Sequence, residues 1–153
     1  MDALQIALVA PVGLQGAAMM FDELHFHRRR GLPRWERIGH PLDTLTVLAC
    51  FGVTLAIPFG TGALGVYAAL AIFSCLFITK DEIVHATRCA PGEQWLHAVL
   101  FVLHPIVLAA AALLWYRGAH AVLVGQTAVT FAFGVYQVVF WNVPWKSRPA
   151  QTP

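Results

Sequence analysis

The sequence contains few charged residues. Only 12% of its 153 residues are Asp, Glu, Lys or Arg, whereas about a quarter of the residues in an average soluble domain are charged. Hydrophobic residues make up 58%, and the mean hydropathy is +0.65. These proportions exclude an ordinary soluble domain. They indicate an all-α integral membrane protein, because each backbone polar group in lipid must be bonded within its own helix.

The absence of several common sequence motifs narrows the range of reactions and ligands to consider. The three cysteines do not imply a disulfide framework, because Cys50 and Cys75 lie in apolar segments and Cys89 lies in a stretch expected to be cytoplasmic. The sequence has no Ser-centred nucleophile motif, phosphate-binding glycine loop or dinucleotide fingerprint. A net charge of +2 does not indicate a nucleic-acid partner, and we expect none.

Five apolar segments are long enough to cross a membrane, since about 20 helical residues span a hydrocarbon core of about 30 Å. We expect these segments at residues 3–21, 42–59, 63–79, 95–116 and 119–141. The first has no basic region before it and no small-residue cleavage site, so we interpret it as a retained helix and not a signal peptide. We expect residues 1–145 to form one transmembrane domain and residues 146–153 a cytoplasmic tail.

Acidic residues and histidines are concentrated in two stretches, residues 21–43 and 80–104. Of the eight acids only Asp2 lies outside them, and of the seven histidines only His120 does. Both stretches begin with Asp-Glu, continue through a His, an Arg and a Pro, and end in Glu-x-x-x-His entering an apolar segment. This similarity predicts an internal two-helix repeat, with an approximate two-fold axis along the membrane normal.

The basic residues predict the orientation. Nine of the ten lie in the two stretches or the tail, and only Arg117 lies in an opposite loop. The nine are Arg28, Arg29, Arg30, Arg34 and Arg37, then Lys80 and Arg88, then Lys146 and Arg148. The positive-inside rule therefore predicts a multi-pass protein of the cytoplasmic (cell inner) membrane, with both stretches and the C-terminus inside and the N-terminus outside.

The spacing within the two stretches predicts a metal site. On a continuing helix, an acid and a His three or four residues apart share a face, so four helices would each direct a carboxylate and an imidazole inward at one depth. We expect two metal ions bound by side chains from this set: Asp22, Glu23, His25, His27, Glu36, His40, Asp43, Glu82, His85, Glu93 and His97.

Carboxylate-bridged sites in four-helix bundles have a related spacing, with Glu-x-x-His on two helices and a Glu on each of two others. Glu82 and His85 fit the Glu-x-x-His spacing, and Glu36 and Glu93 are the candidates for bridging the two ions. The expected fold is therefore a four-helix bundle core plus one helix. Two iron ions suit oxygen and nitrogen ligands, and manganese suits them too.

The letters DELHFHRRRGLPRWERIGH, residues 22–40, resemble the His box and following basic segment of integral membrane alkane hydroxylases. The surplus of histidines resembles the cytoplasmic His boxes of membrane desaturases. The resemblance covers only this segment: Asp22 stands in place of the first His, and the later paired-His boxes are not found. It implies a non-haem di-iron enzyme that oxidises a lipid-like substrate with O₂.

We therefore expect an oxidoreductase with Glu36, Glu93 and His104 as catalytic residues, where His104 lies about 10 Å deeper and orients or gates the substrate. The substrate would be a membrane lipid or another apolar molecule, and electrons would come from a cytoplasmic donor. The oligomeric state is left open. The same residues also suit a di-zinc hydrolase with a Glu base, a b-type haem between His40 and His97, or a divalent-metal transporter.

Two further groups have structural interpretations. Tyr136 and Trp141 lie at the expected cytoplasmic end of the last apolar segment, where such residues are most often interfacial anchors, although they could also line a pocket. We interpret the run Arg28 to Arg30 as a topological signal with contact to anionic headgroups as a secondary role.

Overall fold

The structure, a computed structural model, describes residues 2–143, and within that range its regular elements are all helical. In chain order they are α1 (Ala3–Phe21), the π-helix η1 (Asp22–His27), α2 (Arg28–Arg30), α3 (Arg34–Ala56), α4 (Thr61–Phe77), the 3₁₀-helix η2 (Ile78–Asp81), α5 (Glu82–Arg88), α6 (Pro91–Tyr116) and α7 (His120–Asn142). The predicted tail, residues 146–153, lies outside the described residues.

Five helical stretches are long and apolar enough to cross a membrane. They are Ala3–Arg30, Arg34–Ala56, Thr61–Arg88, Pro91–Tyr116 and His120–Asn142. The predicted all-helical class and the predicted number of such stretches are confirmed. Most of the helices extend further into the charged stretches than the hydropathy pattern predicts, because many of the acids and histidines there face the interior. The orientation in a membrane stays a prediction.

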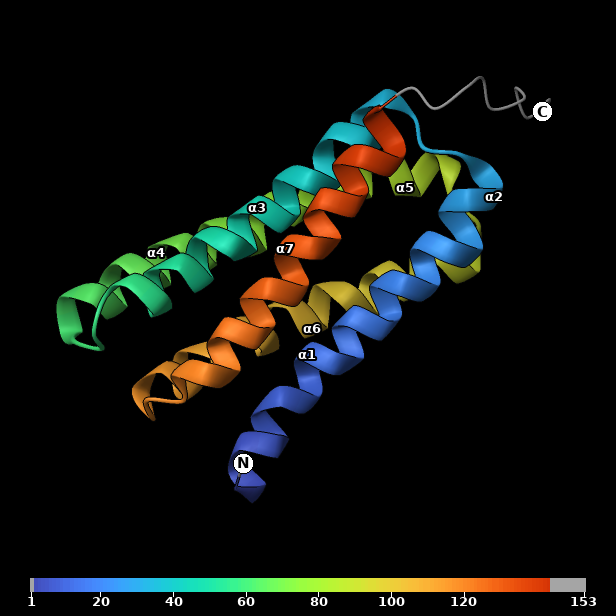
Figure 1. The fold of residues 1–153 in the computed structure, drawn as a ribbon. Helices are drawn as coiled ribbons and strands as arrows, with labels where there is room; N and C mark the ends of the chain where they lie inside the picture. Colours follow the sequence, from blue (N-terminus) through green and yellow to red (C-terminus); the bar gives the residue numbers. More distant parts are fainter. Residues whose placement is uncertain (1, 144–153) are drawn as a thin grey trace.

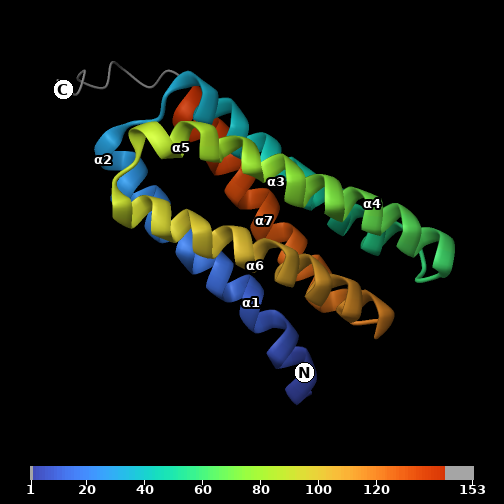
Figure 2. The same cartoon turned by 180° about the vertical axis from the view of Figure 1, so that it is seen from behind.

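The helices run roughly along one direction, as Figure 1 shows, with the N-terminus and the α3–α4 and α6–α7 turns at one end and both acid–His stretches at the other. Helix α3 packs along α7 and α4, and α1 packs along α6. Figure 2 shows α6 and α1 side by side from behind. The internal repeat and the four-helix bundle arrangement stay predictions.

The apolar core lies toward the turn end and joins α3, α4, α6 and the start of α7. Its buried members are Cys50, Phe51, Tyr67, Val107, Leu108, Ala111, Leu114, Trp115, Ala119 and Leu123. Burial of this apolar surface fixes the helices relative to one another at that end. The acid–His end is therefore held together by different contacts, which are polar.

Backbone interruptions shape the polar end. Gly31 has a φ of 77° and ends α2, because this left-handed conformation is readily adopted by glycine. Pro41 lies inside α3 and has no N–H, so the carbonyl of Arg37 lacks its helical donor. Asn142 Nδ2 donates to that carbonyl at 3.0 Å. The end of α7 is thereby attached to the first turns of α3.

Candidate metal centre

The π-helix η1 determines which side chains of the first stretch face inward. Residues five apart share a face in a π-helix, because its hydrogen bonds join i to i+5. Asp22, Glu23 and His27 are buried, with relative exposures of 4%, 2% and 2%. His25 instead turns outward and stacks on Phe21, with ring centroids 5.0 Å apart. The predicted ligand His25 thus lies outside the cluster.

The 3₁₀-helix η2 has a similar effect in the second stretch. Its tighter turn places Asp81 inside and Glu82 outside, whereas His85 on the following α5 is buried. Asp81 and Asp43 both contact the ammonium group of Lys80. The structure therefore does not bring the predicted ligands Glu82 and Asp43 to the cluster: the first is exposed, and the second is paired with a lysine.

A first group that could hold a metal ion consists of Asp22, His27, Glu93 and His97. Each offers one ligand atom, and these atoms lie within 4.8 Å of one another. His27 Nε2 is 3.1 Å from Asp22 Oδ2 and 3.7 Å from Glu93 Oε1, and His97 Nε2 is 2.9 Å from Asp22 Oδ2. All four residues are buried. Two carboxylates and two imidazoles from η1 and α6 thus converge.

A second group consists of Glu36, His85 and Cys89. His85 Nε2 lies 3.7 Å from Glu36 Oε1, and both residues are buried. Burial and the nearby Glu93 carboxylate raise the pKa of the Cys89 thiol to about 12. At neutral pH the thiol is therefore protonated unless a bound cation displaces the proton, as metal ions do with coordinating thiols. The predicted ligand set did not include this cysteine.

Arg30 and a histidine pair join the two groups. One terminal nitrogen of Arg30 lies 2.9 Å from Glu36 Oε2 and 2.9 Å from Glu93 Oε1. His85 Nδ1 lies 2.6 Å from His97 Nδ1. The groups are therefore parts of one cluster. Nothing in the sequence separates Arg30 from the two arginines before it, and only the helix end at Gly31 directs it inward.

Glu23 lies behind His27 as its hydrogen-bond partner. Tyr136 Oη and Trp141 Nε1 donate to Glu23 Oε1 at 2.8 and 2.7 Å. His27 Nδ1 lies 3.2 Å from Glu23 Oε2. Because an ionised carboxylate only accepts, this contact places a proton on Nδ1, and in the neutral imidazole it leaves His27 Nε2 with a lone pair. Carboxylates that orient ligating histidines in this way are common at metal sites.

The cluster carries more negative than positive permanent charge. It buries the four carboxylates of Asp22, Glu23, Glu36 and Glu93, and Arg30 is the guanidinium that forms salt bridges with two of them. Burying unbalanced charge is costly. The remaining three negative charges must be balanced by protons or by bound cations. The residue types and their surplus negative charge thus fit metal ions.

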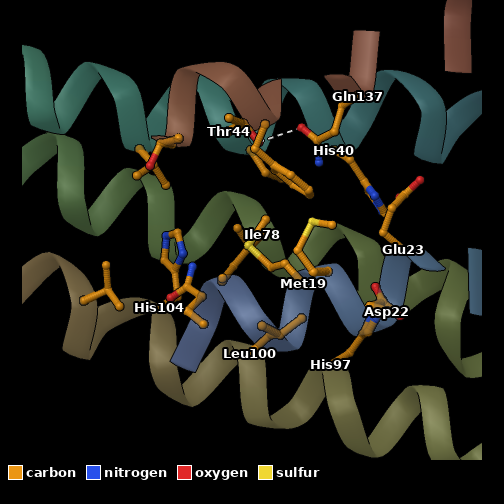
Figure 3. A pocket seen from close by; sticks show the side chains of 18 of the residues that line it. Met19, Asp22, Glu23, His40, Thr44, Ile78, His97, Leu100, His104 and Gln137 are labelled. Atoms are coloured by element: carbon orange, nitrogen blue, oxygen red, sulfur yellow. Dashed lines mark hydrogen bonds and ion pairs between the residues drawn. The ribbon is translucent and has the colours of Figure 1, made fainter. Parts of the chain in front are cut away.

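A cavity of about 330 Å³ begins at the cluster and extends between the helices. Figure 3 shows Asp22 and His97 at one end of it and His104 deeper, with Met19 and Leu100 between them. His40 also lines it, and its ring centroid is 4.9 Å from that of His27. The cavity therefore connects the candidate metal groups with an apolar interior.

His104 lies away from the metal groups, as its spacing predicts. It is buried, and its Nε2 lies 2.9 Å from Ser74 Oγ, which in turn lies 2.7 Å from Thr46 Oγ1. The predicted role of His104 in orienting or gating a substrate stays a prediction.

The predicted ligands fall into three sets. Six lie in the two metal groups: Asp22, His27, Glu36, His85, Glu93 and His97. Glu23 and His40 lie next to His27 without belonging to either group, and His25, Asp43 and Glu82 lie apart.

Comparison of the chain with known protein families, curated proteins and solved structures finds no match. The geometry of the chain itself is therefore what indicates its function. That geometry consists of buried acidic and histidine residues that could hold a metal ion, in a helical protein with five stretches suited to crossing a membrane.

Proposed function

We propose that this chain is a membrane metalloenzyme that holds two metal ions, with iron as the preferred metal, and oxidises an apolar substrate with O₂. The observation that supports it best is a pair of buried imidazole nitrogens, His27 Nε2 and His85 Nε2, that have no hydrogen-bond partner within residues 2–143. Each faces a carboxylate oxygen, from Asp22 and from Glu36 respectively.

When His27, His85 and His97 are neutral, the hydrogen bonds leave both nitrogens with a lone pair. The Glu23 carboxylate accepts from His27 Nδ1, as argued above. In the second chain of contacts, the Asp22 carboxylate accepts from His97 Nε2, so His97 Nδ1 must accept from His85 Nδ1. Both His27 Nε2 and His85 Nε2 then present lone pairs to carboxylate oxygens. That arrangement is repulsive unless a metal ion or a proton lies between the two atoms.

Two ions would therefore use the two groups. The first would be held by Asp22, His27 and Glu93, with His97 donating to Asp22, and the second by Glu36, His85 and Cys89. Glu36 and Glu93 approach the same nitrogen of Arg30, which supports the predicted role of these two carboxylates as bridges. Imidazole and carboxylate ligands suit iron and manganese.

Bound iron would supply the redox chemistry with O₂. One oxygen atom would enter a C–H bond of the substrate and the other would leave as water, which requires two electrons and two protons. The electrons would come from a soluble one-electron donor on the cytoplasmic side of the inner membrane. The chain itself would hold the substrate in the cavity, keep water out with its apolar walls, and orient His27 through Glu23.

A di-zinc hydrolase is the second candidate, and Cys89 is the observation that favours it. A thiolate beside an imidazole and a carboxylate is a ligand set that zinc accepts readily. In that case Glu36 or Glu93 would act as the base. Iron and zinc content therefore decides between the two candidates.

The first test is metal analysis of protein purified without an affinity-tag metal, combined with an absorption spectrum. We expect about two iron ions per chain, as in dinuclear sites, and no Soret band. His27→Ala and Glu93→Ala should lower the bound metal. The matched controls His25→Ala and Glu82→Ala should retain it, because their side chains lie outside the cluster.

The second test is O₂ consumption by the iron-loaded protein with a chemical reductant. We expect the wild type and the two control variants to consume O₂ and the two cluster variants to lose this activity. A zinc-only protein without O₂ chemistry after iron loading would support the hydrolase. Equal metal content in all five proteins would refute the metal site, and a Soret band would select a haem instead.

A further inference from the structure

We propose that the cavity binds the apolar chain of a bilayer lipid, and that this chain enters through an opening between α1 and α7. The binding site and its entrance follow from the cavity alone. Only the role of the bound lipid as the substrate rests on the function proposed above.

The entrance is located by the cavity-lining residues that are also exposed. Among the described lining residues there are three, namely Gly16 and Met20 on α1 and Val129 on α7. Met20 and Val129 have relative exposures of 42% and 71%. The lining residues from α3 and α6 are buried or only partly exposed. The cavity therefore opens on one side, where α1 and α7 both border it.

The packing of the helices agrees with an opening at this place. Helix α1 packs along α6 and helix α7 packs along α3, whereas within residues 2–143 no comparable packing joins α1 to α7. Figure 1 shows these two helices as neighbours on the near side of the molecule. Gly16 has no side chain to narrow the entrance, and an added Cβ there would meet no atom within 4 Å.

The position of the entrance identifies the ligand. Gly16, Met20 and Val129 lie within stretches suited to crossing a membrane, so the opening faces lipid chains and not water. The cavity interior beyond it is mostly apolar, with Val12, Met19, Val47, Leu100, Phe101 and Val107 in its walls.

The shape of the cavity suits one extended chain. Its lining residues on α1 and η1 extend from Val12 to His27, which is roughly 20 Å along these two helices at about 1.5 Å per residue. Its volume of about 330 Å³ is near the lower end of the range for ligand sites, about 300–1,000 Å³. A long and narrow site of this kind places one part of the chain beside His27 and another beside Val107.

The test uses two tryptophan variants of neighbouring glycines. Gly16→Trp should block the entrance, and Gly13→Trp is the matched control, because Gly13 is also exposed on α1 and free of contacts but does not line the cavity. The proteins are placed in phosphatidylcholine nanodiscs that contain a diazirine-tagged fatty acid, illuminated, and analysed by peptide mass spectrometry. The diagnostic residues are His104 and Val107, which line the cavity and are buried.

We expect labelling of these two residues in the wild type and in Gly13→Trp, and a several-fold loss in Gly16→Trp. Val129→Trp should give the same loss from the α7 side, with the exposed non-lining Val124→Trp as its control. Absence of labelling at His104 and Val107 in the wild type would overturn the proposal. Equal labelling in Gly16→Trp and Gly13→Trp would refute the proposed position of the entrance.

Metal content and O₂ consumption are measured on the same samples. A Gly16→Trp protein that keeps its metal and loses labelling separates the entrance from the metal centre and supports the proposal. Labelling of the cavity in a protein that binds no metal would leave the lipid site standing and remove the proposed function. Melting curves show whether any variant has lost its fold.

Discussion

Replacement of Arg30 by Ala tests whether the cluster is built for cations. Arg30 contacts Glu36 and Glu93 at 2.9 Å, and these two side chains are 0% and 2% exposed. Without Arg30 the metal-free protein has two buried carboxylates with one fewer countercharge. The metal-loaded protein has the bound cations to balance them. The substitution should therefore destabilise the metal-free protein much more than the loaded one.

The magnitude follows from the burial of the pair. Removal of one partner of a fully buried salt bridge costs about 3–5 kcal/mol. The Arg30 side chain is 22% exposed, so part of the lost interaction is replaced by water, and we expect about 2–3 kcal/mol in the metal-free protein. For a chain of this length that corresponds to a decrease of roughly 4–12 °C in melting temperature. The loaded protein should lose less than about 1 kcal/mol.

The assay is thermal unfolding in detergent, with each protein measured after chelator treatment and after metal loading. Arg29→Ala is the control, because Arg29 is exposed and its guanidinium lies 3.4 Å from the outward-facing His25, away from the cluster. Its melting temperature should change little in either state. An Arg30→Ala protein with the same loss in both states would refute the reasoning, since the metal would then not replace the guanidinium charge.

Three further predictions concern other parts of the chain. Tyr136→Phe removes one of the two donors to Oε1 of Glu23, the residue whose other oxygen orients His27. Metal affinity should therefore fall by about ten-fold in a chelator competition, and unchanged affinity would contradict this. Gly134→Val places a Cβ 3.0 Å from a side-chain carbon of α3 and should cost about 1–3 kcal/mol in unfolding experiments, whereas Gly125→Val, with open space around it, should cost less. In a cysteine-free background, Ala90→Cys should be labelled only from the cytoplasmic side and His120→Cys only from outside; the reverse pattern would overturn the orientation.

The fold class could be predicted because hydropathy is a strong signal over long segments. The first predicted span, residues 3–21, coincides with α1. The start of α3 could not be predicted in the same way, since Arg34, Glu36 and Arg37 are hydrophilic and hydropathy locates the apolar part of a helix but not its charged first turns. The arrangement of the helices depends on packing between distant residues, which periodicity does not report.

The candidate site could be predicted in composition but not in register. The clustering of acids and histidines located the correct end of the molecule, and the Glu-x-x-x-His spacing on a regular α-helix brought Glu93 and His97 into one group. The rule of an acid three residues before a His assumed an α-helix, and it selected His25 and Glu82 where the π-helix and the 3₁₀-helix present other residues. Cys89 and Arg30 had no sequence signal that separated them from ordinary loop residues.

The π-helix η1 also has a consequence for how this chain tolerates insertions and deletions. A π-turn holds one residue more than the α-helical turn that it interrupts, so it shifts the phase of everything after it by about 100°. This shift places His27, five residues after Asp22, on the same buried face as Asp22, whereas five residues along a plain α-helix would place the two side chains about 140° apart. Deletion of Leu24 would restore a plain α-helix and leave the two residues four apart, still on one face. A related chain could thus lose one codon here and keep the centre, whereas a chain that straightened the π-turn without a deletion would lose the centre while retaining every one of its acids and histidines.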